Sequence, residues 1–429
     1  MKVFIITLGC KVNQYESEAM LKSFLNSGFE KSKEITDADV IVINSCTVTS
    51  TSDQKVRQVI NRSKKKNYDA IIVLTGCMPQ AFPDIAKSFD DVDIVLGNSN
   101  RKDVIKSVIK FMSTHQKIIN IKPYGKKDDF EKIEIDEFHE RTRAFIKIED
   151  GCNRFCSYCI IPYARGRVRS KNLDDLKNEV MRLSDSGYEE VVLVGINLSA
   201  YGEDLGLHLC DAVDTVCDIP GIKRVRLGSL EPERMSENVL KRLSKQGKLC
   251  PQFHLSLQSG CDDTLKRMNR HYNTDEYYEI VLNIRKLFNN PSITTDVMVG
   301  FPSESESEFL ESVEFVEKVG FSKAHVFAYS RRPGTKADLE KNQITKDLKV
   351  SRSKKMIEVT NVSREKFLNS QINTVQSVLF ERYKDSDFYE GYTKNYTPVL
   401  VKSDDILSEK IFNVEIQSVE RGVCIGKLV

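Results

Sequence analysis

Three cysteines in one short segment constrain this chain more than any other feature. Cys152, Cys156 and Cys159 have C-x3-C-x2-C spacing and directly follow a strand-like apolar run, residues 144–148. In a reducing compartment, thiolates this close together usually hold a metal, and the lack of a neighbouring histidine favours an iron–sulfur cluster or zinc over a disulfide. A closed zinc site or a fully ligated cubane takes four protein ligands. Three cysteines therefore predict a metal site with one position open to another ligand.

The segment from Gly151 to Cys159 resembles the signature of the radical S-adenosylmethionine (SAM) superfamily, with Tyr158 as the aromatic residue before the last cysteine. The resemblance implies that the three thiolates hold a 4Fe-4S cluster whose fourth iron binds SAM. It also implies that an electron from this cluster cleaves SAM to give a 5′-deoxyadenosyl radical, a reaction of the kind that proteins delegate to cofactors. A zinc knuckle or incidental thiols is the alternative that the residues leave open.

Composition limits what else the chain can be. Its 429 residues are enough for two or three domains, and a formal net charge of +2 is too small to predict nucleic-acid binding without local patches. The apolar run in residues 1–8 is too short for a signal peptide, and no window approaches the length of a membrane span. We therefore expect a cytoplasmic protein whose 11 cysteines serve in cofactor binding and as buried thiols.

A second group of cysteines follows the strands of an expected amino-terminal sheet. Strand-like runs at 3–8, 40–44, 71–75 and 94–96 alternate with amphipathic stretches, which predicts a doubly wound parallel sheet. Cys10, Cys46 and Cys77 each follow one of the first three runs. Because the carboxyl ends of parallel strands share one edge, the three thiols are expected to meet there. The alternative is a buried small residue at each strand end.

The segment from Thr7 to Ser17 resembles the amino-terminal signature of the methylthiotransferases. Its Lys-Val-Asn-Gln-Tyr run, residues 11–15, is similar to the branch that acts on threonylcarbamoyladenosine in tRNA, whereas relatives that act on isopentenyladenosine or on a ribosomal protein differ there. The resemblance implies a second 4Fe-4S cluster on Cys10, Cys46 and Cys77. It also implies that one SAM methylates a sulfur carried on this cluster, while a second SAM supplies the radical that activates carbon 2 of the adenine.

Six strand–helix units in residues 142–343 predict a partial TIM-type barrel, whose site belongs at the carboxyl ends of its strands. Polar residues follow several of these strands, and the segments resemble the SAM-binding elements of the superfamily. SAM carries an ammonium, a carboxylate and two hydroxyls, and each needs a partner once water is excluded. By this resemblance the SAM-binding residues are Tyr158, Gly195, Asn197, Ser229, Glu231, Gln258 and Asp296.

Arginines near the expected mouth of the barrel are candidates for RNA binding. Arg165, Arg167 and Arg331 could each hold a phosphate through the planar guanidinium, or could form surface ion pairs. From residue 373 onward, short alternating segments predict a small antiparallel β-barrel. Residues 390–396 resemble the TRAM domain, an RNA-binding module, in which Tyr392 and Tyr396 could stack on bases or pack in the core.

The sequence therefore predicts an α/β protein with four segments: a methylthiotransferase domain (1–120), a linker (121–141), a radical SAM domain of (β/α)6 type (142–370) and a TRAM domain (371–429). The expected function is transfer of a methylthio group to threonylcarbamoyladenosine in the tRNA anticodon loop. The alternatives are the same reaction on isopentenyladenosine or a ribosomal protein, or a non-catalytic RNA-binding metal protein. The expected cofactors are two 4Fe-4S clusters and SAM, and the expected partners are tRNA and an electron donor such as flavodoxin or ferredoxin. We expect a monomer with no membrane association.

Overall fold

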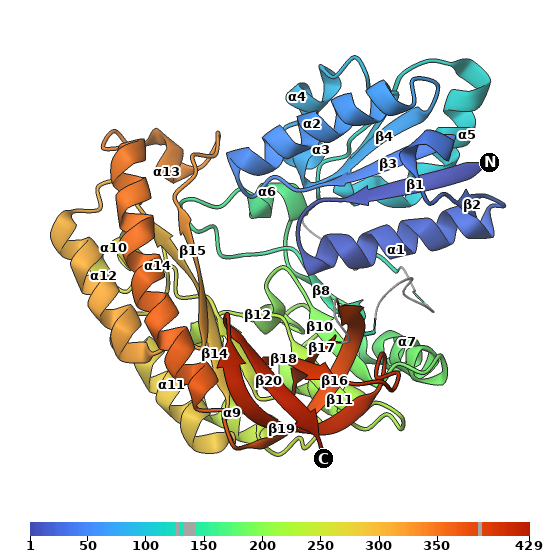
Figure 1. The fold of residues 1–429 in the computed structure, drawn as a ribbon. Helices are drawn as coiled ribbons and strands as arrows, with labels where there is room; N and C mark the ends of the chain where they lie inside the picture. The colour runs from blue at the N-terminus through green and yellow to red at the C-terminus, as the bar shows by residue number, and fades with distance from the viewer. Residues whose placement is uncertain (126–127, 133–134, 136–141, 385–387) are drawn as a thin grey trace.

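The computed structural model describes residues 1–125, 128–132, 135, 142–384 and 388–429. Along the chain, a parallel sheet is followed by a partial barrel and then by a small closed barrel (Figure 1). The expected linker, residues 121–141, falls in part outside the described residues. Within the described part, no helix has the length and apolarity needed to cross a bilayer.

The amino-terminal sheet contains six parallel strands in the order β2-β1-β3-β4-β5-β6. Alternate residues of each strand point to opposite faces, so Ile41 and Ile43 pack with α2, whereas Val40 and Val42 pack with α1 and α5. Helices cover both faces, as the apolar strands require. The elements are β1 (Lys2–Thr7), α1 (Lys11–Asn26), β2 (Glu30–Lys31), β3 (Val40–Ser45), α2 (Ser50–Lys66), β4 (Ile71–Gly76), α3 (Cys77–Ala81), α4 (Pro83–Lys87), β5 (Ile94–Leu96), a 3-10 segment η2 (Asn98–Asp103), α5 (Val104–Thr114) and β6 (Ile118–Asn120).

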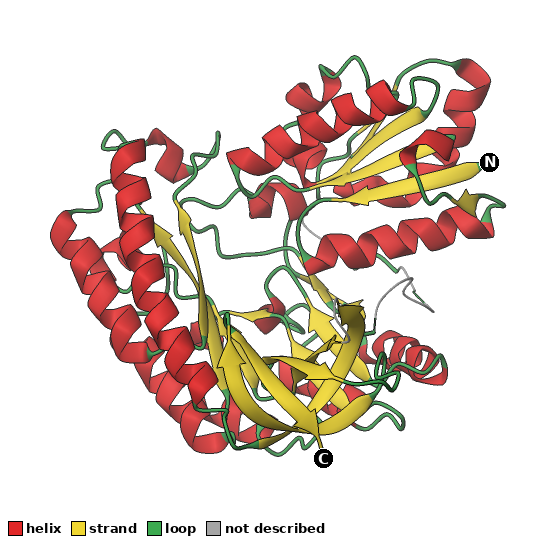
Figure 2. Cartoon of the chain, viewed as in Figure 1, coloured by secondary structure: helices red, strands yellow, loops and turns green. Residues whose placement is uncertain are grey.

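The partial barrel is built from parallel strands in chain order, as the sequence predicted. One sheet has the order β11-β10-β7 and the other β12-β13-β14-β15, and they adjoin where β11 passes into β12 at Gly228. Helices α11, α12 and α14 lie along one side of β14 and β15 (Figure 2). The strands of these two sheets are β7 (Ala144–Lys147), β10 (Glu190–Val194), β11 (Arg224–Leu227), β12 (Ser229–Leu230), β13 (Gln252–Leu255), β14 (Ser292–Val299) and β15 (Lys323–Ala328). Two short strands, β8 (Glu149–Asp150) and β9 (Arg169–Ser170), form a separate antiparallel pair. The helices are α6 (Ile161–Arg165), α7 (Leu173–Asp185), α8 (Leu209–Cys217), α9 (Glu237–Leu243), α10 (Asp262–Arg267), α11 (Thr274–Leu287), α12 (Glu306–Val319), α13 (Lys336–Leu339) and α14 (Lys346–Asn369).

The carboxyl-terminal strands close into a barrel in the order β16-β17-β18-β20-β19. They are β16 (Val375–Lys384), β17 (Phe388–Thr393), β18 (Pro398–Lys402), β19 (Ile411–Glu420) and β20 (Val423–Leu428). The expectation of a wholly antiparallel barrel needs correction, because β18 and β20 pair in parallel to complete the closure. The architecture is consistent with a TRAM module.

The closed barrel docks on β11 of the partial barrel through arginine side chains. The guanidinium of Arg224 donates to the carbonyl oxygens of Ser377 (2.7 Å) and Tyr392 (3.2 Å). Arg226 donates to the carbonyl oxygen of Lys394 (2.9 Å). Both guanidinium groups also pair with Glu190 of β10, which neutralises part of their buried charge.

Candidate functional site

The first group of cysteines, here called the amino-terminal triad, comprises Cys10, Cys46 and Cys77. Cys10 caps α1 after β1, Cys46 follows β3, and Cys77 begins α3 after β4. Because β1, β3 and β4 are neighbours in the sheet, the three thiols lie at one edge. A Cβ built on Gly9 would lie 2.9 Å from Cβ of Cys46, which shows how closely two of these loops approach.

The second group, here called the barrel triad, comprises Cys152, Cys156 and Cys159 in the loop after β8. Gly151 begins this loop at φ +91°, where an added Cβ would lie 2.0 Å from the carbonyl oxygen of Arg167. Phe155 also has a left-handed backbone, at φ +50°, an uncommon conformation that is frequent at functional sites. In this loop Cys152 Sγ lies 3.8 Å from Nδ2 of Asn197, and Cys156 Sγ lies 3.3 Å from a guanidinium nitrogen of Arg270, so two of the thiols contact the partial barrel.

Burial raises the pKa of the Cys46 thiol to about 11 and that of Cys152 to about 12. In both cases a neighbouring thiol of the same triad adds to the increase. Such thiols stay protonated at neutral pH unless a metal displaces the proton. Each triad thus has the chemistry of a metal-binding group whose occupation releases protons.

The donor set fits an iron–sulfur cluster better than a single ion. Among the described residues, no three cysteine, histidine or acidic side chains converge on one ion-sized position. A cluster has no such requirement, because each thiolate binds a different iron. A guanidinium also contacts a sulfur of each triad: Arg165 lies 3.2 Å from Cys77 Sγ, and Arg270 lies 3.3 Å from Cys156 Sγ. Positive groups of this kind offset the negative charge of a thiolate-bound cluster.

Two of the residues expected to bind SAM have buried oxygens without a partner. Asn197, in the loop after β10, and Gln258, in the loop after β13, leave Oδ1 and Oε1 unpaired in the described structure. Gln258 is also held at φ +69°, a strained conformation for this residue. Unsatisfied buried acceptors are uncommon in folded proteins and are suited to the ammonium and hydroxyl donors of SAM.

Gly195 and Asn197 are positioned by Glu149 of β8. A Cβ at Gly195 would lie 2.6 Å from Oε2 of Glu149, so a larger residue there would displace this carboxyl. The same Oε2 accepts a hydrogen bond from the backbone N–H of Asn197 (2.7 Å). Burial raises the pKa of Glu149 well above its ordinary value. Glu149 was missed in the sequence because it belongs to a strand pattern with no motif of its own.

The remaining expected SAM residues lie around the same barrel. Glu231 follows β12 and forms an ion pair with Arg270, which also contacts Cys156. Ser229 lies exposed on β12, and Asp296 of β14 lies 3.4 Å from Nε2 of His254. Tyr158 packs edge-on against Phe301. Arg270 was missed because it sits in a loop after α10, where no strand-end pattern marks it.

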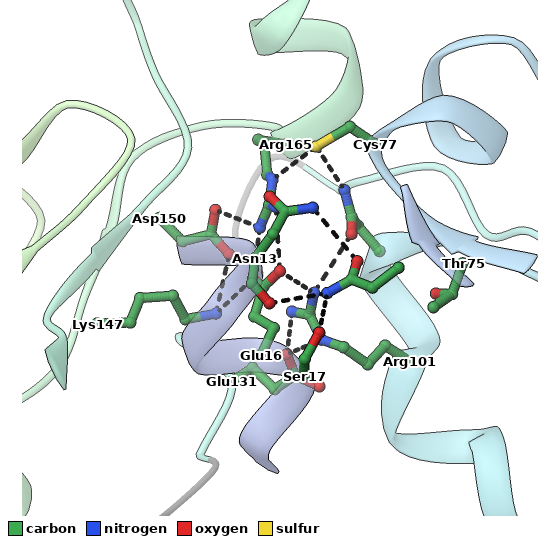
Figure 3. A network of polar contacts seen from close by, with 12 residues as sticks. Asn13, Glu16, Ser17, Thr75, Cys77, Arg101, Glu131, Lys147, Asp150 and Arg165 are labelled. Carbon is green, nitrogen blue, oxygen red and sulfur yellow. Dashed lines mark hydrogen bonds and ion pairs between the residues drawn. The ribbon is translucent and has the colours of Figure 1, made fainter. Parts of the chain in front are cut away.

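The prediction that Arg165 binds RNA is wrong. Arg165 is fully buried and donates to Glu16 and Asn13 of α1 as well as to Cys77 (Figure 3), so its guanidinium is not available to a phosphate. The sequence could not reveal this, because the partners lie in a different domain. Arg167 is exposed, with its guanidinium 4.9 Å from the ring centroid of Phe155. Arg331 is exposed and pairs with Asp338.

The two candidate tyrosines stack on each other. The rings of Tyr392 and Tyr396 have centroids 4.6 Å apart and an interplanar angle of 18°. The guanidinium of Arg143 lies 5.1 and 4.9 Å from the two ring centroids. Tyr396 is 36% exposed, which leaves part of this stack accessible.

Comparisons with known proteins agree with this geometry. The profile described as "Uncharacterized protein family UPF0004" matches residues 2–97, and the radical SAM superfamily profile matches residues 146–316. The threonylcarbamoyladenosine tRNA methylthiotransferase MtaB of Bacillus subtilis is 36% identical over 96% of this chain and 92% of its own length. The tRNA-2-methylthio-N(6)-dimethylallyladenosine synthase of Finegoldia magna is 34% identical over 99% of this chain and 94% of its own length.

Among solved structures, the radical SAM methyltransferase TsrM from Kitasatospora setae, determined with cobalamin and a 4Fe-4S cluster bound, has a TM-score of 0.60 at 12% identity. The match covers 79% of this chain and 77% of that one. At this identity the similarity concerns the fold, and it extends beyond the partial barrel.

Proposed function

Because the chain belongs to the radical SAM tRNA methylthiotransferases, we propose that it transfers a methylthio group to carbon 2 of threonylcarbamoyladenosine in the anticodon loop of tRNA. Relatives that carry this activity in their names are 36–38% identical to the chain, against 34% for those named for dimethylallyladenosine. The Lys-Val-Asn-Gln-Tyr run at residues 11–15 supports the same choice.

The observation that carries the proposal is the short connection between the two triads through α6 and Arg165. Helix α6 starts two residues after Cys159 and ends at Arg165, whose guanidinium contacts Cys77. A helix of 5 residues is about 8 Å long, so the two triads are joined by a short rigid element. Two metal groups, one on each triad, would therefore be near enough to serve the same bound base.

An aromatic C–H bond has no acidic proton at neutral pH, so acid–base catalysis alone fails. The two 4Fe-4S clusters and SAM, when bound, supply the radical and sulfur chemistry that the reaction needs. The chain's own residues bind and orient: Asn197 and Gln258 accept hydrogen bonds from SAM, and Arg270 balances charge beside Cys156. Tyr158, Gly195, Ser229, Glu231 and Asp296 complete the proposed SAM site.

The RNA substrate is proposed to contact groups on both barrels, namely the exposed Arg167, Arg331 and Tyr396 and the half-buried Tyr392. A base must leave its stack to reach a buried site, at a cost of about a few kcal/mol that is least in an unpaired loop. We further propose that a protein donor such as flavodoxin or ferredoxin provides electrons, and that the enzyme acts as a monomer in the cytoplasm.

Nucleoside mass spectrometry of tRNA tests the proposal. A strain that lacks this protein should lose 2-methylthio-threonylcarbamoyladenosine and accumulate its precursor. The wild-type chain should restore the modification, whereas Cys77→Ala and Cys152→Ala should not. If methylthio-isopentenyladenosine is lost instead, the substrate assignment is wrong. If all methylthio-nucleosides persist, the assignment to tRNA fails, and iron analysis then separates an enzyme with another substrate from a structural zinc protein.

A further inference from the structure

The geometry points to Arg165 as a positioning residue that couples the amino-terminal triad to the partial barrel through its charge. Arg165 ends α6 of the partial barrel, yet its Nε donates to Cys77 Sγ in the amino-terminal domain (3.2 Å). The inference rests on the proposed function in one respect, namely that the amino-terminal triad holds a cluster. It adds that a positive charge from the partial barrel, the guanidinium of Arg165, belongs to this site.

Arg165 is held by the amino-terminal domain through several bonds. Its Nη2 donates to Glu16 Oε2 (3.0 Å) and Asn13 Oδ1 (3.1 Å), and Nη1 also pairs with Glu16. Asn13 Oδ1 in turn accepts from Cys10 Sγ (3.3 Å). One guanidinium thus contacts Cys77 directly and Cys10 through a single side chain.

Asn98 supports the same contact from the other side. It follows β5, and its Nδ2 donates to the carbonyl oxygen of Ala164 in α6 (3.0 Å) and lies 3.5 Å from Cys77 Sγ. The residue next to Arg165 is therefore anchored on the amino-terminal domain as well. The end of α6 has a fixed position relative to the sulfur.

The ion pairs of the buried network around Glu16, part of which Figure 3 shows, join more cations than carboxylates. Among the described residues, four cations are linked there with three carboxylates: Arg101, Lys147, Arg165 and Arg169 with Glu16, Glu131 and Asp150. An uncompensated buried cation is costly, and a thiolate-bound cluster at Cys77 would supply the missing negative charge.

The sign of the effect follows from this arrangement. A guanidinium beside the sulfur stabilises the reduced form of a cluster, which carries the additional electron, more than the oxidised form. Glu16 weakens that effect because its carboxylate pairs with the same guanidinium. Removing the charge of Arg165 and removing that of Glu16 should therefore shift the reduction potential in opposite directions, which a merely structural role would not do.

The test uses the full chain with Cys152, Cys156 and Cys159 changed to Ala, so that only the amino-terminal triad can hold a cluster. The midpoint potential is measured by anaerobic redox titration followed by electron paramagnetic resonance. Arg165→Gln should lower the potential, and Glu16→Gln should raise it. Arg165→Lys, which keeps the charge, should lie nearer to wild type than Arg165→Gln. Arg242→Gln, at an exposed pair with Asp211 and Asp214, should change nothing.

If Glu16→Gln does not fold, the reduction potential of Lys147→Met can be compared with that of Arg165→Gln instead. Lys147 pairs with Glu16 (3.1 Å) and, among the contacts described, touches no thiol, so its loss should lower the potential less than Arg165→Gln does. Backbone hydrogen exchange in α3 and α6 gives a second readout. Removal of iron should accelerate this exchange in the wild type, and should accelerate it less in Arg165→Gln. Shifts in the same direction for Arg165→Gln and Glu16→Gln, or no shift for Arg165→Gln, overturn the inference alone. A background protein that binds no iron overturns the proposed cluster as well.

Discussion

At the scale of single residues, Gln258 combines a strained backbone with an unpaired buried oxygen. We predict that Gln258→Gly leaves the free energy of unfolding unchanged or raises it slightly, because glycine adopts φ +69° without strain. SAM affinity should fall about tenfold, which corresponds to the loss of one hydrogen bond of about 1.4 kcal/mol. Equilibrium binding of SAM to the iron-loaded protein measures this.

Asn373→Gly is the matched control. Asn373 is exposed at φ +64° before β16, so its change relieves similar strain without touching the partial barrel's site. Equal loss of SAM affinity in both variants would contradict the role given to Gln258.

The buried carboxyl of Glu16 should make the stability of the fold depend on pH. Burial alone would raise its pKa, but Arg101, Arg165 and Lys147 outweigh burial and lower the pKa to about 2 from 4.5. A carboxyl with a depressed folded-state pKa stabilises the fold above its unfolded pKa and loses that contribution as pH falls through the folded value. The contribution is on the order of 3 kcal/mol at neutral pH.

We therefore expect Glu16→Gln to melt well below the wild type at pH 7, with the difference narrowing as the pH falls from about 5 to about 3. Thermal unfolding of the metal-free proteins across that range checks this. A difference in melting temperature that is independent of pH would contradict the ionised state of Glu16.

The sequence predicts the position of a side chain that directly follows a strand. It does not predict the position of a side chain whose partners lie in another domain. Cys10, Cys46 and Cys77 meet because each ends a neighbouring strand, a relation that alternation and length reveal. Asn98 follows β5 in the same way and could have been found by that rule. Arg165 resembled a surface arginine in the sequence, because its partners Glu16 and Asn13 are far away along the chain.

At the scale of elements, glycines fix the loops that present the thiols. Gly76, before Cys77, has φ +99°, and an added Cβ would lie 2.4 Å from the carbonyl oxygen of Ser45. We predict that Gly76→Ala lowers the free energy of unfolding by at least about 2 kcal/mol and removes iron from the amino-terminal triad alone. Chemical unfolding and iron analysis measure the two effects.

The control variant Gly28→Ala distinguishes the effect of a steric clash from that of backbone strain. Gly28 has a similar conformation, φ +82°, but no atom lies within 4 Å of the added Cβ. Gly28→Ala should cost only about 1 kcal/mol and keep all iron. If Gly28→Ala lost as much iron as Gly76→Ala, the close packing of β3 and β4 would not be what holds the site.

The elements themselves followed largely from alternation and helical periodicity, but several short strands were missed, among them β2 (Glu30–Lys31) and β6 (Ile118–Asn120) at the edges of the amino-terminal sheet. β17 (Phe388–Thr393) has a weak strand signal in the sequence, because Glu390 and Gly391 interrupt its apolar pattern. Gly391 is nevertheless required there, since an added Cβ would lie 2.6 Å from the carbonyl oxygen of Leu379 on β16. Close approach of two strands is a tertiary requirement that local propensity does not express.

At the scale of the whole molecule, three domains meet through buried charge. The amino-terminal sheet is linked to the partial barrel by the network around Glu16, and the closed barrel is linked to β11 by Arg224 and Arg226. Buried charges of this kind favour one arrangement of the domains, because each cation left without its partner would be costly. The two triads can then keep a constant geometry relative to each other.

The central claim is that the chain carries two separate three-thiol sites, each holding a 4Fe-4S cluster. Iron and acid-labile sulfide per chain, measured after anaerobic reconstitution, test it most directly. We expect the wild type to hold twice the iron of a variant with Cys10, Cys46 and Cys77 changed to Ala, and twice that of a variant with Cys152, Cys156 and Cys159 changed to Ala. Zinc without sulfide, or a wild type with no more iron than either variant, would contradict it.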